Sequence, residues 1–172
     1  SKRVNRNGRE IARERENDMT EFKIHTPETA TREVGETLRQ VQEGLGFIPN
    51  VFAVIAESAP ALEAFVGLNF RLAESSLTPT ERELIQLAVS VSNECAYCVA
   101  GHSAFADLQD LDMDVVAAAR CGGTPDDERL AALDELTKAL VGAKGPVDPA
   151  LLEGFYAAGY ESRHLFEVIL GI

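Results

Sequence analysis

The chain has 172 residues, a hydrophobic fraction of 45% and a formal net charge of -12. This length suits one domain with a real core, and the hydrophobic fraction argues against wholesale disorder. The acidic balance disfavours nucleic acid or an anionic membrane surface as the main partner, and no apolar run approaches the roughly 20 residues of a membrane helix.

The N-terminus and the cysteine content bear on compartment. Residues 1–20 are predicted to be a polar extension, either natural or added to the natural chain, followed by one helical domain over 21–172; Met19 is a candidate natural start. The extension has no apolar segment typical of a secretory signal. Three cysteines are too few for a disulfide scaffold and would leave one unpaired in a secreted protein. We therefore expect a reducing cytoplasm, where a CxxC pair is more often catalytic or metal-binding than structural.

Apolar residues recur at helical spacing along the whole chain, and no segment shows the alternation of a half-buried strand. The helical segments, in chain order, fall within 31–46, 50–57, 58–76, 78–92, 95–110, 112–123, 124–145, 148–160 and 161–172. The prediction is an all-α fold of one domain with six to eight helices.

Several residues mark predicted helix boundaries. Thr78 as N-cap, Pro79 at the first helical position and Glu81 at the third form a capping box, the clearest helix start in the chain. Asn50 is expected to cap a short helix, and Gly159 to separate the last two helices.

Other conspicuous side chains have simpler interpretations. Cys121, before two glycines at a helix end, is expected to be a buried small hydrophobe. His25 and His164 are expected to be structural or surface residues. The phenylalanines are interpreted as core, although some are candidates for an apolar substrate channel: Phe52, Phe65, Phe70 and Phe105.

The segment NECAYCVAGHSAF, residues 93–105, carries the candidate chemistry. If it is helical, Cys95, Cys98 and His102 fall within roughly 60° on one face, at about 100° per residue. Cys95 is expected in the first turn, where free N–H groups and the helix dipole stabilise a thiolate. His102 is one turn from Cys98, within reach of a proton exchange, and two cysteines at this spacing can close a disulfide.

The preceding helix offers a carboxylate to this histidine. Glu83 lies twelve residues before Cys95, at the border of an apolar stripe. If the two helices form a hairpin, Glu83 can face His102 or the thiols. A carboxylate in that position orients an imidazole and raises its basicity.

Zinc is the main rival to redox chemistry, because Cys95, Cys98, His102 and Glu83 are all ligand types that zinc accepts. Structural zinc sites usually draw a second ligand pair from a distant loop, so three ligands along one helix fit poorly, and we favour a redox dithiol. A third interpretation is that these side chains merely pack. Haem attachment is excluded, because it requires the histidine directly after the second cysteine.

Taken together, Glu83, the pair Cys95 and Cys98, and His102 resemble the active-site motif of the AhpD-like alkylhydroperoxidases, within the carboxymuconolactone decarboxylase superfamily. The segments LTPTERELI and SNECAYC also resemble this family, and the likeness covers about residues 44–172. A lone CxxC is a weak signal, whereas four residue types at this spacing are specific.

The resemblance implies an AhpD-like helical bundle that forms homotrimers or homohexamers and uses neither metal nor haem. It implies that peroxide oxidises Cys98, that Cys95 resolves the product, and that Glu83 with His102 relays protons. The helix dipole favours Cys95 as the attacking thiol and the histidine spacing favours Cys98, which we assign. Tyr97, expected at the pocket border or in an interface, stands where the characterised hydroperoxidase has a histidine.

The expected function is a cytoplasmic thiol-dependent peroxidase that reduces organic hydroperoxides or hydrogen peroxide. The resemblance implies a dithiol reductant, of lipoyl or thioredoxin-like type. One alternative is a disulfide reductase or redox adaptor that serves another peroxidase. Another is a non-enzymatic helical oligomer that senses redox state or binds metal. Lactone decarboxylation is disfavoured, because decarboxylase members of the superfamily typically lack the cysteine pair.

Overall fold

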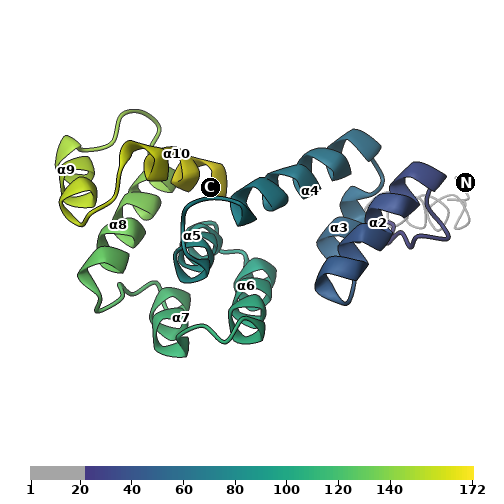
Figure 1. Cartoon of the computed structure of the whole chain (residues 1–172), viewed down its shortest axis with the longest axis horizontal. Coiled ribbons are helices and arrows are strands. Elements are labelled where there is room, and N and C mark those ends of the chain that lie inside the picture. Colours follow the sequence, from purple (N-terminus) through teal and green to yellow (C-terminus); the bar gives the residue numbers. More distant parts are fainter. Residues whose placement is uncertain (1–21) are drawn as a thin grey trace, which may run out of the picture. The chain divides into compact units, whose positions relative to one another are not determined.

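The computed structural model describes residues 22–172, and every regular element in this part of the chain is a helix (Figure 1). The all-α prediction is confirmed. The predicted count of six to eight is wrong, since the described residues form nine helices, α2 to α10. Four of the eight connections between these helices contain glycine or proline, and the other four are short turns, such as residues 93–95, that end one helix before the next begins. None of the described helices is long and apolar enough to cross a membrane.

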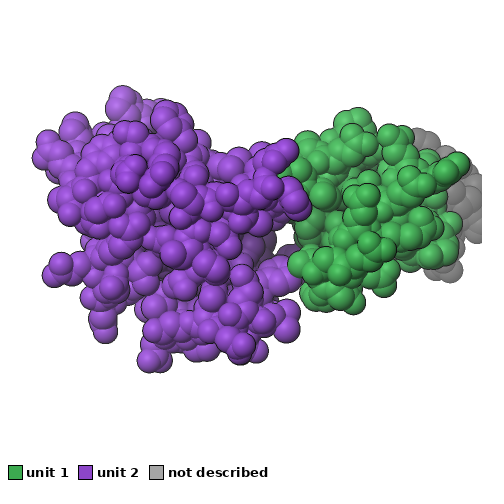
Figure 2. All heavy atoms as spheres, viewed as in Figure 1, with its two compact units in different colours: residues 1–67 green, residues 68–172 purple. Residues whose placement is uncertain are grey.

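The described residues group into two compact units, divided between Gly67 and Leu68 (Figure 2). Helix α4, Ala59–Ala73, begins in the first unit and its last six residues belong to the second. The predicted domain boundary at residue 20 lies outside the described residues, and a single domain over 21–172 stays a prediction.

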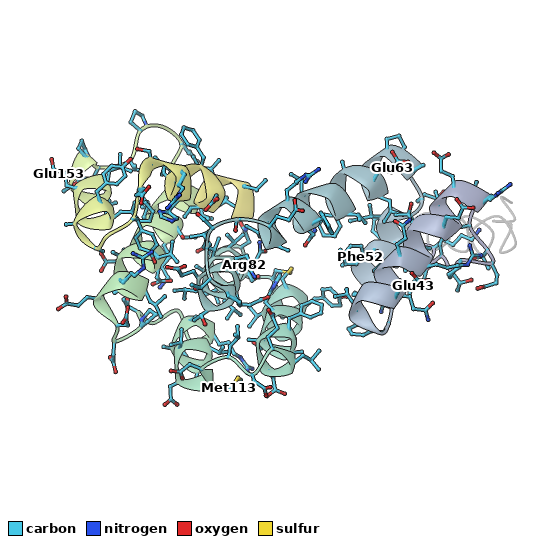
Figure 3. All side chains as sticks on the ribbon, in the orientation of Figure 1. Glu43, Phe52, Glu63, Arg82, Met113 and Glu153 are labelled. Atoms are coloured by element: carbon cyan, nitrogen blue, oxygen red, sulfur yellow. A yellow bond between two sulfur atoms is a disulfide. The ribbon has the colours of Figure 1, made fainter. Side chains whose placement is uncertain are left out.

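The first unit contains α2, Arg32–Leu45, α3, Asn50–Ile55, and the start of α4. Phe52, labelled in Figure 3, packs its ring 5.0 Å from the ring of Phe65. The buried residues of this core are Val34, Leu38, Val41, Phe52, Ala56 and Leu62. The prediction for Asn50 is wrong: Pro49 occupies the N-cap with no side-chain cap, because its extended backbone already ends the loop and Asn50 is the first helical residue.

The second unit is built around one helix, α5, Pro79–Ser92. This helix contacts α6, α7, α8 and α10, and it lies among them in Figure 1. These neighbours and α9 span Ala96–Leu108 (α6), Met113–Arg120 (α7), Glu128–Gly142 (α8), Pro149–Ala157 (α9) and Ser162–Gly171 (α10). Gly159 follows α9 with a φ of 89° and separates it from α10, as predicted. A buried apolar cluster fills this unit, with Leu84, Ile85 and Leu87 contributed by α5.

The capping box predicted at the start of α5 is present and is also a tertiary anchor. Thr78 Oγ1 accepts from the Glu81 backbone N–H, and Glu81 Oε2 accepts from the Thr78 backbone N–H at 2.8 Å. The other carboxylate oxygen, Oε1, accepts from Tyr160 Oη at 2.8 Å and from Arg129 Nε at 3.0 Å. The Arg129 guanidinium also lies 3.8 Å from the centroid of the Tyr160 ring. One buried carboxylate therefore joins α5 to α8 and to the loop between α9 and α10.

Hydrogen bonding keeps this buried carboxylate charged. Burial alone would raise the pKa of Glu81, but the hydrogen bonds from Thr78, Tyr160 and Arg129 outweigh it and hold the pKa below the ordinary value of 4.5. A lowered native pKa means that Glu81 stabilises the fold above its unfolded pKa. That contribution is lost as the pH falls through the native pKa.

Two expected core positions are exposed instead. Phe70, predicted as core, is 62% exposed on α4, because no described element covers that side of the helix. Cys121, predicted as buried, is an exposed free thiol in the turn that follows α7. In both cases the local pattern identifies an apolar side chain but does not show whether another element covers it.

The Glu81 network predicts a specific stability defect. Tyr160→Phe keeps the ring but removes the hydroxyl, so the free energy of unfolding should fall by about 1–2 kcal/mol at pH 7. The deficit should shrink as acid protonates Glu81, since the lost donor served its charged form. Urea unfolding from pH 7 to pH 3 measures both effects. Tyr156→Phe, on an exposed ring, is the control, and an equal loss there would contradict the assignment.

Candidate active site

A tight turn folds α6 back along α5. Cys95 donates its backbone N–H to the Ser90 carbonyl at 2.9 Å, and Glu94 adopts the left-handed conformation, with φ at 54°. Non-glycine residues take this conformation at an energetic cost and mainly where the surroundings require it. The turn thus produces the hairpin that the sequence predicts, and α5 and α6 pack side by side (Figure 1).

The two cysteines sit at the N-terminal end of α6 and form a disulfide, with their Cα atoms 5.3 Å apart. Cys95 was expected in the first turn but occupies the N-cap, because its φ of -88° and ψ of 89° are not helical. Its Sγ accepts the backbone N–H of Cys98 at 3.2 Å. An N–H aimed at sulfur favours negative charge there, so this geometry helps Cys95 to leave as a thiolate once the disulfide opens.

The hairpin brings Glu83 of α5 against His102 of α6. His102 Nδ1 lies 3.0 Å from Glu83 Oε2, with the two side chains 25% and 15% exposed. The contact is thus largely screened from solvent. When the carboxylate accepts from Nδ1–H, the second ring nitrogen, Nε2, becomes the proton acceptor. The phenyl ring of Phe105 lies edge-on to the imidazole, with the centroids 6.2 Å apart.

Gln109 is a second partner of Glu83 that sequence reasoning missed. Its Nε2 donates to Glu83 Oε1 at 3.1 Å and to the Phe105 carbonyl at 3.0 Å. Gln109 is the C-cap of α6, seven residues after His102 and thus two turns further along. This spacing was the available signal, but glutamine at a helix end is too common to single out. Both oxygens of Glu83 are therefore occupied, which fixes the plane of its carboxylate.

The remaining candidate residues are Tyr97, which stands between the two cysteines but does not line the pocket beside Cys95, and two histidines outside the site. Tyr97 is 55% exposed. His25 is buried in the first unit with Nε2 2.6 Å from Glu57 Oε2, and His164 accepts the Glu161 backbone N–H at 2.8 Å. Both histidines are structural, as expected. Within residues 22–172, no cluster of three or more His, Cys, Asp or Glu side chains is arranged to hold a metal ion.

A test of the Glu83–His102 contact is the tautomer of the imidazole. Glu83→Ala should shift neutral His102 from the Nδ1–H form toward a mixture of tautomers, because the carboxylate that selects this form is removed. Gln109→Ala should give a smaller shift, since Glu83 keeps its contact but loses its second restraint. Imidazole 15N chemical shifts measure the tautomer. Glu153→Ala, which changes an exposed acid of α9, is the control, and an unchanged His102 spectrum in Glu83→Ala would contradict the contact.

Comparison with known proteins gives a family match and two similar folds. Residues 59–126 match the model of the carboxymuconolactone decarboxylase family. One similar structure is an uncharacterized peroxidase-related protein from Silicibacter sp. TM1040, with 26% identity, a TM-score of 0.73, and coverage of 82% of this chain and 76% of that one. Another has an alkylhydroperoxidase AhpD core and is an uncharacterized peroxidase-related protein from Ralstonia eutropha JMP134, with 23% identity, a TM-score of 0.76, and coverage of 87% and 81%. No curated protein sequence matches the chain.

The matched segment contains every residue of the candidate site. The cysteine pair, His102, Glu83 and Gln109 all lie within residues 59–126. The fold similarity extends well beyond this segment, to more than four fifths of the chain. The chain therefore contains a segment that matches the carboxymuconolactone decarboxylase family model, and its fold is AhpD-like.

Proposed function

We propose that this protein is a thiol-dependent peroxidase that reduces organic hydroperoxides or hydrogen peroxide. The observation that carries the proposal is the Glu83–His102 pair, at 3.0 Å, on the same hairpin as the Cys95–Cys98 disulfide. A redox-active dithiol needs a base to form its thiolate and an acid for the leaving oxygen, and this pair supplies both. The two peroxidase-related proteins of similar fold support the same chemistry.

The proposed oxidation starts from the reduced cysteine pair. His102 Nε2 takes the thiol proton of Cys98, one helical turn away on α6, and the thiolate attacks the terminal peroxide oxygen. An S–O bond forms, the O–O bond breaks, and the departing alkoxide takes a proton from His102 and leaves as an alcohol. Cys98 is then a sulfenic acid. The Cys95 thiol displaces its hydroxyl as water, and the disulfide forms.

Glu83 acts through His102 in this scheme. Its carboxylate holds Nδ1–H, keeps Nε2 free for the thiol proton and stabilises the imidazolium that forms. Gln109 donates to the other carboxylate oxygen of Glu83, so the carboxylate keeps its orientation toward Nδ1 during each proton transfer. Glu83 and Gln109 are thus positioning residues, while His102 and the two cysteines are the reacting groups.

The cycle closes when an external dithiol reduces the disulfide, and we propose a lipoyl-type or thioredoxin-like donor. No step requires a metal or haem. We further propose a cytoplasmic homotrimer or homohexamer. In the described residues several large apolar side chains are exposed and can serve an interface, among them Leu68, Phe70, Phe166 and Ile169.

The peroxidase assignment predicts the behaviour of cysteine variants. Cys98→Ser should abolish the consumption of cumene hydroperoxide in the presence of a dithiol, because the sulfur that attacks oxygen is lost. Cys95→Ser should keep one oxidation equivalent and lose turnover, because the sulfenic acid has no resolving thiol. Peroxide consumption and sulfenic-acid trapping measure the two outcomes.

Cys121→Ser is the matched control, since it removes an exposed free thiol outside the site and should leave turnover unchanged. Turnover retained in Cys98→Ser would exclude Cys98 as the peroxide-reactive thiol. If neither reduced cysteine reacts with peroxide although a dithiol reduces the disulfide, the disulfide reductase alternative replaces the peroxidase. Stoichiometric zinc that resists mild chelation would overturn the redox proposal.

The proton relay predicts a graded loss of rate. His102→Ala should lower kcat for hydroperoxide by about 10²–10⁴-fold, the usual worth of general acid–base catalysis. Glu83→Gln should lose less, because the imidazole remains but its orientation and imidazolium stabilisation weaken. Steady-state kinetics across a pH series measure both. His164→Ala is not a suitable control because that residue is buried, whereas Glu153→Gln changes an exposed acid of α9 and should keep kcat.

A further inference from the structure

A hollow lies against one side of the disulfide and has no part in the proposed oxidation. It is a shallow hollow, open to solvent, with a volume of about 420 Å³. Cys95 lines it, whereas Cys98, Glu83 and His102 do not. The two sulfurs thus differ in their surroundings: Cys95 borders the hollow, and Cys98 shares its helix with the histidine one turn away.

The lining combines apolar side chains with two opposite charges. Val91, Ala96 and Val99 supply apolar surface suited to an aliphatic chain. Arg120 is the one cation of the lining and Glu94 the one acid. Among the described residues, the Arg120 side chain has no hydrogen-bond or ion-pair partner, and its exposed guanidinium is therefore available to an anion.

The turn that carries Arg120 is held in place from two sides. Arg120 ends α7, and Gly122 follows in the left-handed conformation, with φ at 72°. A Cβ at Gly122 would lie 3.6 Å from Val91 Cγ1, so this turn packs on α5. Lys138 of α8 donates to the carbonyls of Gly122 and Gly123 at 3.1 and 2.9 Å, and pairs with buried Asp134 at 2.6 Å. Arg120 therefore projects from an anchored backbone at the hollow.

We propose that this hollow binds the reductant and that the reductant is a thiol compound with a carboxylate. The carboxylate pairs with Arg120, the aliphatic part lies on the apolar lining, and a thiolate attacks Cys95. This assignment rests on the proposed disulfide cycle. It adds the side from which the reductant enters, Cys95 as the sulfur that is attacked, and Arg120 as the residue that selects the reductant. The carboxylate of Glu94 repels the carboxylate of the reductant, so it reduces the preference for a carboxylate-bearing thiol that Arg120 creates.

The reduction balances with a dithiol as the electron donor. One thiolate of the dithiol forms a bond to Cys95 Sγ while the Cys95–Cys98 bond breaks, and Cys98 leaves as a thiolate that takes a proton from His102 or solvent. The second thiolate then displaces Cys95, which leaves toward the Cys98 backbone N–H. The dithiol ends as a cyclic disulfide, two electrons have moved, and both cysteines are reduced.

The first experiment compares dihydrolipoate with dihydrolipoamide, which share a dithiol and differ in the carboxylate. Anaerobic reduction of the disulfide is followed without peroxide by the appearance of protein thiols. At low ionic strength the wild type should react about three- to fivefold faster with the acid than with the amide, the range expected of an exposed ion pair. Arg120→Gln should abolish the preference, Glu94→Gln should increase it, and high salt should suppress it.

Arg39→Gln, on an exposed arginine of the first unit, is the control and should keep the wild-type preference. Equal rates for the two dithiols in the wild type, or a preference that survives Arg120→Gln, would overturn this inference and leave the peroxidase proposal intact. Failure of both dithiols to reduce the disulfide would contradict the redox cycle itself, and this inference with it.

A second experiment identifies the attacked sulfur. The monothiol 3-mercaptopropionate opens the disulfide but cannot displace itself by ring closure, so the mixed disulfide can be trapped by acid and alkylation. Chymotryptic cleavage after Tyr97 separates the two cysteines for mass spectrometry. The adduct should be on Cys95, with Cys98 alkylated. An adduct mainly on Cys98 would overturn the assignment of the hollow as the entry side.

Discussion

The buried carboxylate of Glu81 is the interaction on which the second unit depends. It caps its own helix, α5, and accepts from Arg129 of α8 and from Tyr160 after α9, so three stretches of chain meet at one charge. Burial of a carboxylate without partners costs several kcal/mol, so the arrangement is stable only when every donor is in place. A single residue thereby sets both the start of α5 and its position against α8.

The position of α5 in turn determines the chemistry. Glu83 follows Glu81 by two residues, and two residues turn a helix by about 200°. The two carboxylates therefore project to nearly opposite sides, Glu81 toward the Arg129–Tyr160 network and Glu83 toward His102 on α6. Glu81 orients α5 and Glu83 orients the imidazole of His102. A displacement of Glu81 would therefore move α5 and with it the carboxylate of Glu83.

The disulfide lies between two environments that suit the two halves of a redox cycle. On one side, the Glu83–His102 pair can move protons for chemistry at Cys98. On the other, the hollow with Arg120 at its edge offers access to Cys95. In the proposed cycle the reductant approaches Cys95 from this hollow, whereas the peroxide meets Cys98, so the two reactants do not compete for one position. The short spacing makes this possible, because both sulfurs stay within bonding distance throughout.

The sequence by itself determined the helical class, the capping box at Thr78 and Glu81, and the set Glu83, Cys95, Cys98 and His102. The helical class, the capping box and the spacing of the cysteines and His102 follow from local patterns, whereas Glu83 is identified through the family resemblance and the hairpin expected between two helices. Only the tertiary structure decided that Gln109 holds Glu83, that Arg129 and Tyr160 satisfy Glu81, and that Phe70 and Cys121 are exposed. Those facts depend on which elements pack together across many residues of chain, and no local pattern records how a distant helix is placed.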